Sequence, residues 1–265
     1  MLLYLLLLFI GTALGSFSLV LAWRMHSGTD WVRGRSACDS CKHELGVTDL
    51  IPVVSYAVLR GACRYCKKPI PKTVLLAETG FGIVAVLSFV FWPYALFGFG
   101  FVLFGMWITI LVLLSALFWY DMRWFLLPNK LVYPLIVLSA LFVLGVWLVQ
   151  NSSVTSGLLV PVGSAVFLSG LFFVLYAVSR GKWIGFGDVR LAVALGLILG
   201  SPLLSWIMLF IASCLGILVA LPKLVNKKIK FQTQIPFGPL LISATIIVFL
   251  FGRNIIRSYT NFIGL

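Results

Sequence analysis

The sequence predicts an all-α polytopic membrane protein with about eight transmembrane helices and a small cysteine-rich cytoplasmic domain after the first helix. Hydrophobic residues make up 62% of the chain and charged residues 10%, whereas about a quarter of the residues in a soluble domain are charged. The apolar residues form long continuous runs, and a helix that spans a bilayer needs about 20 such residues. Transmembrane strands would instead give short segments of alternating polarity. The chain is therefore expected to lie in a lipid bilayer.

The first apolar run, residues 2–23, is interpreted as a retained transmembrane helix. A signal peptide would begin with basic residues, but the first positive charge here is Arg24, after the run. We expect further spans at residues 73–92, 94–120, 131–149, 157–178, 188–200, 203–222 and 237–252. The predicted domains are the first helix (1–23), a cytoplasmic zinc-ribbon-like domain (24–72) and a seven-helix membrane domain (73–265).

The basic residues indicate the orientation of these spans. If residues 24–72 lie in the cytoplasm, eight spans place 18 of the 20 Lys and Arg residues on the cytoplasmic side, as the positive-inside rule requires. The net charge of +13 is then explained by topology, so no nucleic-acid partner is expected. The same count places Asp121 and Asp188 at the cytoplasmic ends of their spans.

The segment after the first span contains two Cys-x-x-Cys pairs, Cys38 with Cys41 and Cys63 with Cys66. Each pair can present two thiolates to one ion, and two pairs complete the tetrahedral shell of a structural zinc. Disulfides are disfavoured in the cytoplasm, and a domain of about 50 residues has too small a core to fold easily without a staple. We therefore predict structural zinc, with a metal-free or redox role as the alternative.

Past residue 50, the acidic residues are Glu78, Asp121 and Asp188. An ionisable residue within or at the edge of a membrane span is costly, and it is therefore a candidate functional residue. Asp121 closes the third apolar run. Asp188 follows Gly185 and Gly187, which allow backbone conformations or a close approach that a side chain would block.

Two aspartates on different spans allow three kinds of site. Carboxylates that share one water can act as general base and general acid, because repulsion and desolvation separate their proton affinities, and such a pair can hydrolyse a peptide bond without a covalent intermediate. They can also serve a carboxylate-dependent ion or proton transporter. Finally, each acid can simply pair with a nearby arginine, Arg123 or Arg190. The residue types alone leave all three open.

Taken together, these features resemble the prepilin peptidase (type IV leader peptidase) family of GxGD-type intramembrane aspartyl proteases. The likeness covers nearly the whole chain, and the combination of segments is much more specific than GxGD alone. The matching segments are Gly15-Ser16-Phe17, the two cysteine pairs, Asp49 to Tyr56 with Leu59-Arg60-Gly61, Asp121 with Pro128-Asn129, Gly185-Phe186-Gly187-Asp188, and Ile235-Pro236-Phe237-Gly238-Pro239.

The resemblance implies a multi-pass peptidase of the bacterial cytoplasmic (inner) membrane, with its active site and cysteine domain facing the cytoplasm. Asp121 and Asp188 occupy the two catalytic positions, and Gly185 and Gly187 belong to the active-site loop. The implied substrates are prepilins or pseudopilins of type IV pilus, competence and type II secretion systems, whose short basic leader ends in glycine. Many family members also methylate the new N-terminal amine with S-adenosylmethionine.

The sequence departs from the family pattern at three places. Leu19 replaces a frequent asparagine, Arg24-Met25-His26 replaces Arg-x-Pro, and Val74-Leu75-Leu76 replaces Tyr-Pro-Leu before the acid that matches Glu78. These changes leave the two aspartates untouched and bear on methylation only. Glu78 is accordingly a candidate methyltransferase residue, with an ion pair to a loop lysine or arginine as the alternative.

Overall fold

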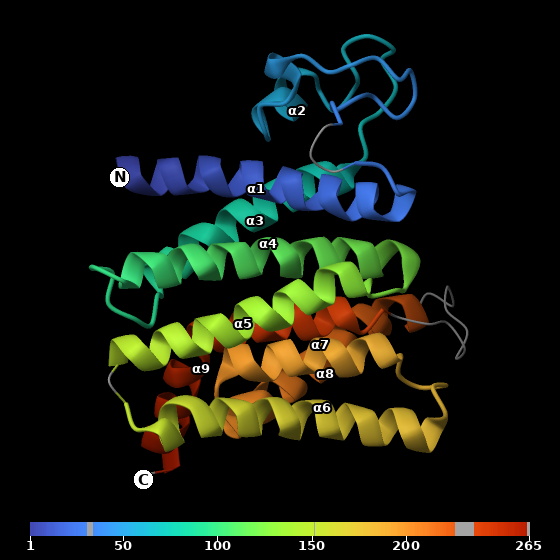
Figure 1. Ribbon diagram of the computed structural model, residues 1–265. Coiled ribbons are helices and arrows are strands. Elements are labelled where there is room, and N and C mark those ends of the chain that lie inside the picture. Colours follow the sequence, from blue (N-terminus) through green and yellow to red (C-terminus); the bar gives the residue numbers. More distant parts are fainter. Residues whose placement is uncertain (31–33, 151, 226–235, 264–265) are drawn as a thin grey trace. The chain divides into compact units, whose positions relative to one another are not determined.

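The computed structural model is nearly all helical and describes residues 1–30, 34–150, 152–225 and 236–263 (Figure 1). The α-helices are α1 (Leu2–Ser27), α2 (Val54–Val58), α3 (Lys72–Val90), α4 (Gly100–Trp124), α5 (Asn129–Gln150), α6 (Val160–Ser179), α7 (Phe186–Leu199), α8 (Pro202–Val225) and α9 (Gly238–Ile263). Short helical turns η1 (Val47–Asp49) and η2 (Thr155–Leu159) complete the helical elements. The described residues contain no β-strand, only two isolated bridges. The all-α prediction is therefore confirmed.

Seven helices in the described part of the chain are long and apolar enough to cross a bilayer. They are α1, α3, α4, α5, α6 with η2, α8 and α9. The remaining predicted span corresponds to α7, which has 14 residues and, at about 1.5 Å per residue, is shorter than a hydrocarbon core of about 30 Å. The chain is thus a multi-pass membrane protein. Of the residues in the charge argument, Arg33, Lys227, Lys228 and Lys230 lie outside the described ranges.

The chain forms two compact units, Met1–Trp92 and Pro93–Leu265, which are described separately. In the first unit, α1 packs against α3 through small residues. Gly11 and Gly15 are four residues apart on α1, the spacing that lets two membrane helices approach closely. A methyl group on Gly15 would lie 2.4 Å from the carbonyl oxygen of Ala77 on α3. Gly15 therefore serves the packing of these two helices.

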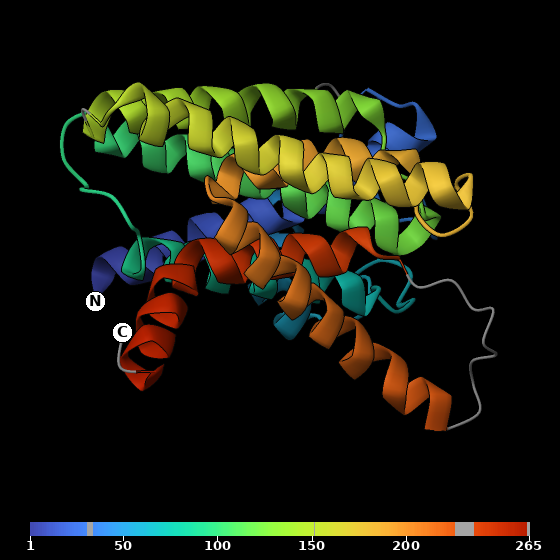
Figure 2. The same cartoon turned by 90° about the horizontal axis from the view of Figure 1, so that it is seen from below.

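The short helix α7 forms the core of the second unit. It contacts α5, α6, α8 and α9, and Leu191, Ala192 and Leu195 are fully buried. From Leu191 to Leu199 the helix is apolar all round, and such a segment belongs in a buried position. It ends at Leu199, and the C-cap residue Gly200 adopts a left-handed conformation with φ of +65°. Figure 2 shows its neighbours α8 and α9 crossing, with α9 bent along its length.

Candidate active site and metal centre

Asp121 lies in the last turn of α4, with its side chain buried. The helix ends at Trp124 because Phe125 adopts a left-handed conformation, with φ of +55°, and donates its N–H to the carbonyl oxygen of Asp121 at 3.0 Å. This hydrogen bond fixes the backbone of Asp121 near the point where the loop to α5 begins.

Asp188 is the third residue of α7, after the N-cap residue Gly185, and it is half-buried. Its carboxylate accepts a hydrogen bond from the backbone N–H of Gly185. The N-terminus of a helix favours negative charge, and the C-terminus disfavours it. The two aspartates therefore lie at helix ends of opposite polarity.

The structure brings the two predicted aspartates together in the second unit. Their charges lie close enough to repel each other. A third element completes this site: the N–H of Gly238, at the start of α9, donates to Oδ2 of Asp121 at 3.1 Å. A methyl group on Gly238 would lie only 2.5 Å from the same oxygen, so a side chain there would displace the carboxylate.

The sequence had not indicated the contact between Gly238 and Asp121. Gly238 lies in the proline- and glycine-containing segment near the end of the chain, between Pro236 and Pro239, and this composition was the available signal. Ile235, the first residue of that segment, lies outside the described residues.

The two glycines before Asp188 have different surroundings. Gly185 has φ of −75° and ψ of 150°, an extended conformation that most residues adopt. A methyl group on Gly187 would lie 3.0 Å from Cβ of Leu127, in the loop between α4 and α5. Gly187 thus permits a close approach between the segments that carry the two aspartates.

Arg190 is not paired with Asp188 in the described part of the chain. Its guanidinium donates to Oδ1 of Asn129 at the start of α5 and lies 4.6 Å from the ring centre of Phe186. These contacts join the N-terminal ends of α5 and α7. They give no support to an ion pair between Asp188 and Arg190.

The four cysteines lie on two similar turns in the first unit. In the first turn, the N–H of Cys38 donates to the carbonyl oxygen of His43 and the N–H of Lys42 donates to that of Cys38. The second turn repeats this pattern with Cys63, Lys68 and Lys67. Both Lys42 and Lys67 have φ of +57°. The repeated sequence Ala-Cys-x-x-Cys-Lys, at Ala37 and Ala62, was a signal for this repeat.

The sulfurs of Cys38, Cys41, Cys63 and Cys66 lie within 4.8 Å of one another, and those of Cys38 and Cys66 are 3.9 Å apart. Four zinc–sulfur bonds of about 2.3 Å in a tetrahedron place the sulfurs about 3.8 Å apart. Backbone N–H groups of Cys41 and Ser40 lower the pKa of Cys38 to about 6, which favours the thiolate that binds metals, whereas burial and the three neighbouring cysteines raise the pKa of Cys66 to about 11. The cluster therefore fits a tetrahedral zinc ion.

Glu78 is buried within α3, and its Oε2 accepts a hydrogen bond from the N–H of Val53 at 2.7 Å. Val53 has φ of +62°, a rare conformation for a β-branched residue. The described partner of Glu78 is thus a backbone N–H rather than a lysine or arginine. Its candidate role in methyl transfer stays a prediction.

Two models of known protein families match parts of this chain. Residues 9–92 match the model of the bacterial peptidase A24 N-terminal domain, and residues 108–221 match that of the type IV leader peptidase family. No solved structure matches the chain significantly.

Several relatives carry the name prepilin leader peptidase/N-methyltransferase. The relative from Vibrio cholerae is 29% identical over 89% of this chain and 92% of its own length. The Burkholderia pseudomallei relative is 33% identical over 82% of this chain and 67% of its own length. The Pseudomonas aeruginosa relative is 31% identical over 86% and 76% respectively. This chain therefore belongs to the type IV leader peptidase family.

Proposed function

We propose that the chain is an aspartic endopeptidase that cleaves the basic leader from type IV prepilin or pseudopilin proteins, with Asp121 and Asp188 as the catalytic residues. The observation that carries this proposal is the convergence of two sheltered carboxylates, from α4 and α7, on one electrostatically coupled site. Membership of the type IV leader peptidase family supports the choice of substrate.

The two carboxylates have different tasks in the proposed reaction. The N-terminus of α7 favours the charged form of Asp188, so Asp188 takes a proton from a shared water as the water attacks the scissile carbonyl carbon. Asp121, at the C-terminal end of α4, keeps a proton and donates it to the leaving amine. The N–H of Gly238 binds Oδ2 of Asp121, which leaves Oδ1 to carry that proton.

The active site and the cysteine domain face the cytoplasm of the bacterial inner membrane in this proposal. The support is the charge pattern, with 18 of 20 Lys and Arg residues on one side of the predicted spans. The hydrophobic helix of the substrate would reach the aspartates from the lipid bilayer. The transporter alternative has no support from the relatives described above, which are named as peptidases.

Cys38, Cys41, Cys63 and Cys66 would hold one structural zinc, which would staple a segment too small for a large core. The names of the relatives include N-methyltransferase. We therefore also propose that the chain methylates the new N-terminal amine with S-adenosylmethionine. Glu78 is the candidate residue for that step.

The proposal is tested by incubating the purified protein in detergent with a substrate that has a basic leader and a Gly-Phe junction. We expect cleavage by the unchanged protein and by Glu44→Gln, which alters an exposed acid, and no cleavage by Asp121→Asn or Asp188→Asn. Normal cleavage by either aspartate variant would refute the catalytic pair. Ion-coupled flux in proteoliposomes without cleavage would favour the transporter. Mass spectrometry of the product tests methylation, which an unmodified amine in the presence of S-adenosylmethionine would refute.

A further inference from the structure

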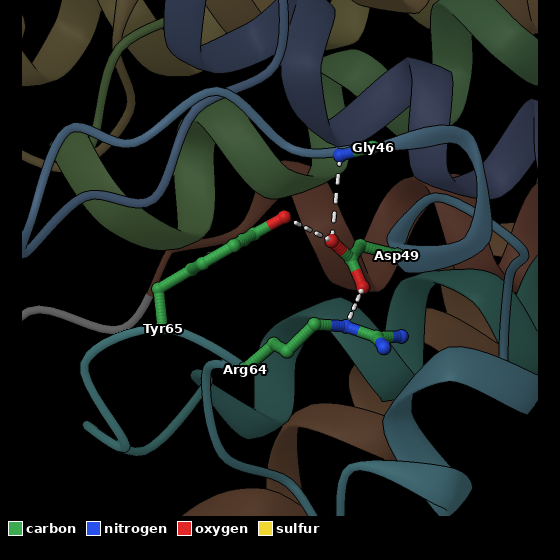
Figure 3. Close-up of polar contacts among 4 residues, drawn as sticks. All are labelled: Gly46, Asp49, Arg64 and Tyr65. Carbon is green, nitrogen blue, oxygen red and sulfur yellow. Dashed lines mark hydrogen bonds and ion pairs between the residues drawn. The ribbon is translucent and has the colours of Figure 1, made fainter.

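The carboxylate of Asp49 accepts hydrogen bonds from two residues of the second cysteine turn and from Gly46 (Figure 3). Its Oδ1 accepts from Nε of Arg64 at 2.7 Å. Its Oδ2 accepts from the N–H of Gly46 at 3.3 Å and from the hydroxyl of Tyr65 at 3.4 Å. Arg64 and Tyr65 are the two residues between Cys63 and Cys66, whereas Gly46 is the N-cap of η1, three residues before Asp49 in the segment that follows the first turn. The side chain of Asp49 thus ties the segment that follows the first turn to the second turn.

An aromatic contact joins the same two turns. The rings of His43 and Tyr65 lie 3.7 Å apart between centroids. His43 follows the first cysteine pair, and Tyr65 lies within the second. The Asp49 contacts and this ring contact involve no cysteine, so both can persist when the thiolates bind no ion.

The burial of Asp49 distinguishes these contacts from an ordinary surface ion pair. Its side chain is 3% exposed, and a buried charge must be compensated by partners. Burial alone would raise the pKa of Asp49, but the hydrogen bond and charge of Arg64, with the bonds from Gly46 and Tyr65, hold the pKa below its usual value. The ion pair between Arg35 and Glu44, by contrast, is largely exposed.

The segment that carries Asp49 is also fixed at its other end. Four residues further on, the N–H of Val53 is bound by the buried Glu78 of α3. A strained backbone such as that of Val53 persists only where its surroundings hold it. Asp49 therefore acts from an anchored segment of the chain.

We propose that Asp49 is a positioning residue for the metal centre: it holds the segment that follows the first cysteine turn against the second turn before an ion binds. This inference rests on the proposed zinc site and adds a residue that ligates nothing itself. Groups outside the ligand shell that hold metal ligands in place strengthen metal binding, because the metal ion then has less of the chain to order. Loss of such a group typically weakens metal binding by about 10–100-fold.

The test is a competition for zinc between the purified full-length protein and a chromogenic chelator. We expect Asp49→Ala to bind zinc about 10–100-fold more weakly than the unchanged protein, with a smaller loss for Asp49→Asn, which retains one acceptor. Tyr65→Phe keeps the ring beside His43 and removes only the hydroxyl, so we expect the smallest loss. Glu44→Gln is the matched control, because it removes an exposed acid from the same domain, and we expect no change.

Cobalt substitution separates positioning from loss of the fold. We expect the variants to show the absorption of tetrahedral thiolate-bound cobalt once saturated, with only the concentration needed for saturation raised. Equal zinc affinities of Asp49→Ala and Glu44→Gln would overturn the role of Asp49 but not the proposed zinc site. Absence of zinc from the unchanged protein would overturn the zinc site as well. If Asp49→Ala does not accumulate, the test rests on Asp49→Asn and Tyr65→Phe. Zinc affinities of both variants equal to that of the unchanged protein would overturn the inference.

Discussion

Replacement of Gly238 by alanine tests the arrangement around Asp121 most sharply. The new methyl group would lie 2.5 Å from Oδ2 and 3.3 Å from Cγ of Asp121. An ordinary contact needs at least 3.4 Å, so the carboxylate or the start of α9 must move. The same change disturbs the 3.1 Å hydrogen bond from the Gly238 N–H.

The magnitude follows from these two effects. A hydrogen bond to a neutral group contributes about 0.5–1.5 kcal/mol, and a misplacement of about 1 Å can lower a rate by about 100-fold. Because both effects act on the same carboxylate, they are not simply added. We expect kcat/KM for leader cleavage to fall by about 10–100-fold.

The assay is leader cleavage by the purified protein, with the thermal unfolding midpoint measured in parallel. Gly105→Ala is the matched control, since Gly105 lies on α4 like Asp121 and a methyl group there meets no atom within 4 Å. We expect that control to cleave normally. A folded Gly238→Ala protein with unchanged kcat/KM would refute the role given to Gly238.

Three further predictions concern stability. Gly196→Ala places a methyl group 2.5 Å from Cα of Ala165 on α6, and we expect the free energy of unfolding to fall by about 1–3 kcal/mol. Gly163→Ala is the control, because a methyl group there meets no atom within 4 Å, and we expect no change. Equal thermal unfolding midpoints for the two variants would contradict the packing of α7. Glu78→Ala leaves the Val53 N–H without its acceptor, so we expect a loss of about 1–3 kcal/mol and faster proteolysis near Val53, whereas Glu78→Gln should lose less. Equal proteolysis of both Glu78 variants and the unchanged protein would contradict that anchor. Chelation of zinc should increase proteolysis of residues 34–70 and leave the far-ultraviolet circular dichroism of the membrane helices intact; unaltered proteolysis would contradict a structural metal.

The helices could be predicted because their signal is local. Long apolar runs and the breaks between them placed all eight predicted spans on observed helices, and the predicted span at residues 188–200 ends within one residue of the end of α7. The cysteine cluster could be predicted for a similar reason, since Cys-x-x-Cys places two thiolates on one turn. The division of the chain at residues 23 and 72 stays a prediction.

The contacts between distant segments could not be predicted in the same way. Asp121 and Gly238 meet only because α4 and α9 pack together, and no periodicity in either segment encodes that partner. Val53 is a β-branched residue with positive φ, against its local preference, because tertiary contacts hold it. Asp49 likewise gains Arg64 and Tyr65 as partners from a turn that meets its segment only in the folded domain.

The central claim is that Asp121 and Asp188 act as one catalytic unit, and a double-mutant comparison tests it most directly. Residues that act as a unit have strongly non-additive effects on rate. We predict that Asp121→Asn, Asp188→Asn and the double variant all show no cleavage of a prepilin-like substrate above the rate without protein, although each inserts and folds normally. Measurable cleavage by either single variant, lowered further and independently in the double variant, would contradict a shared site.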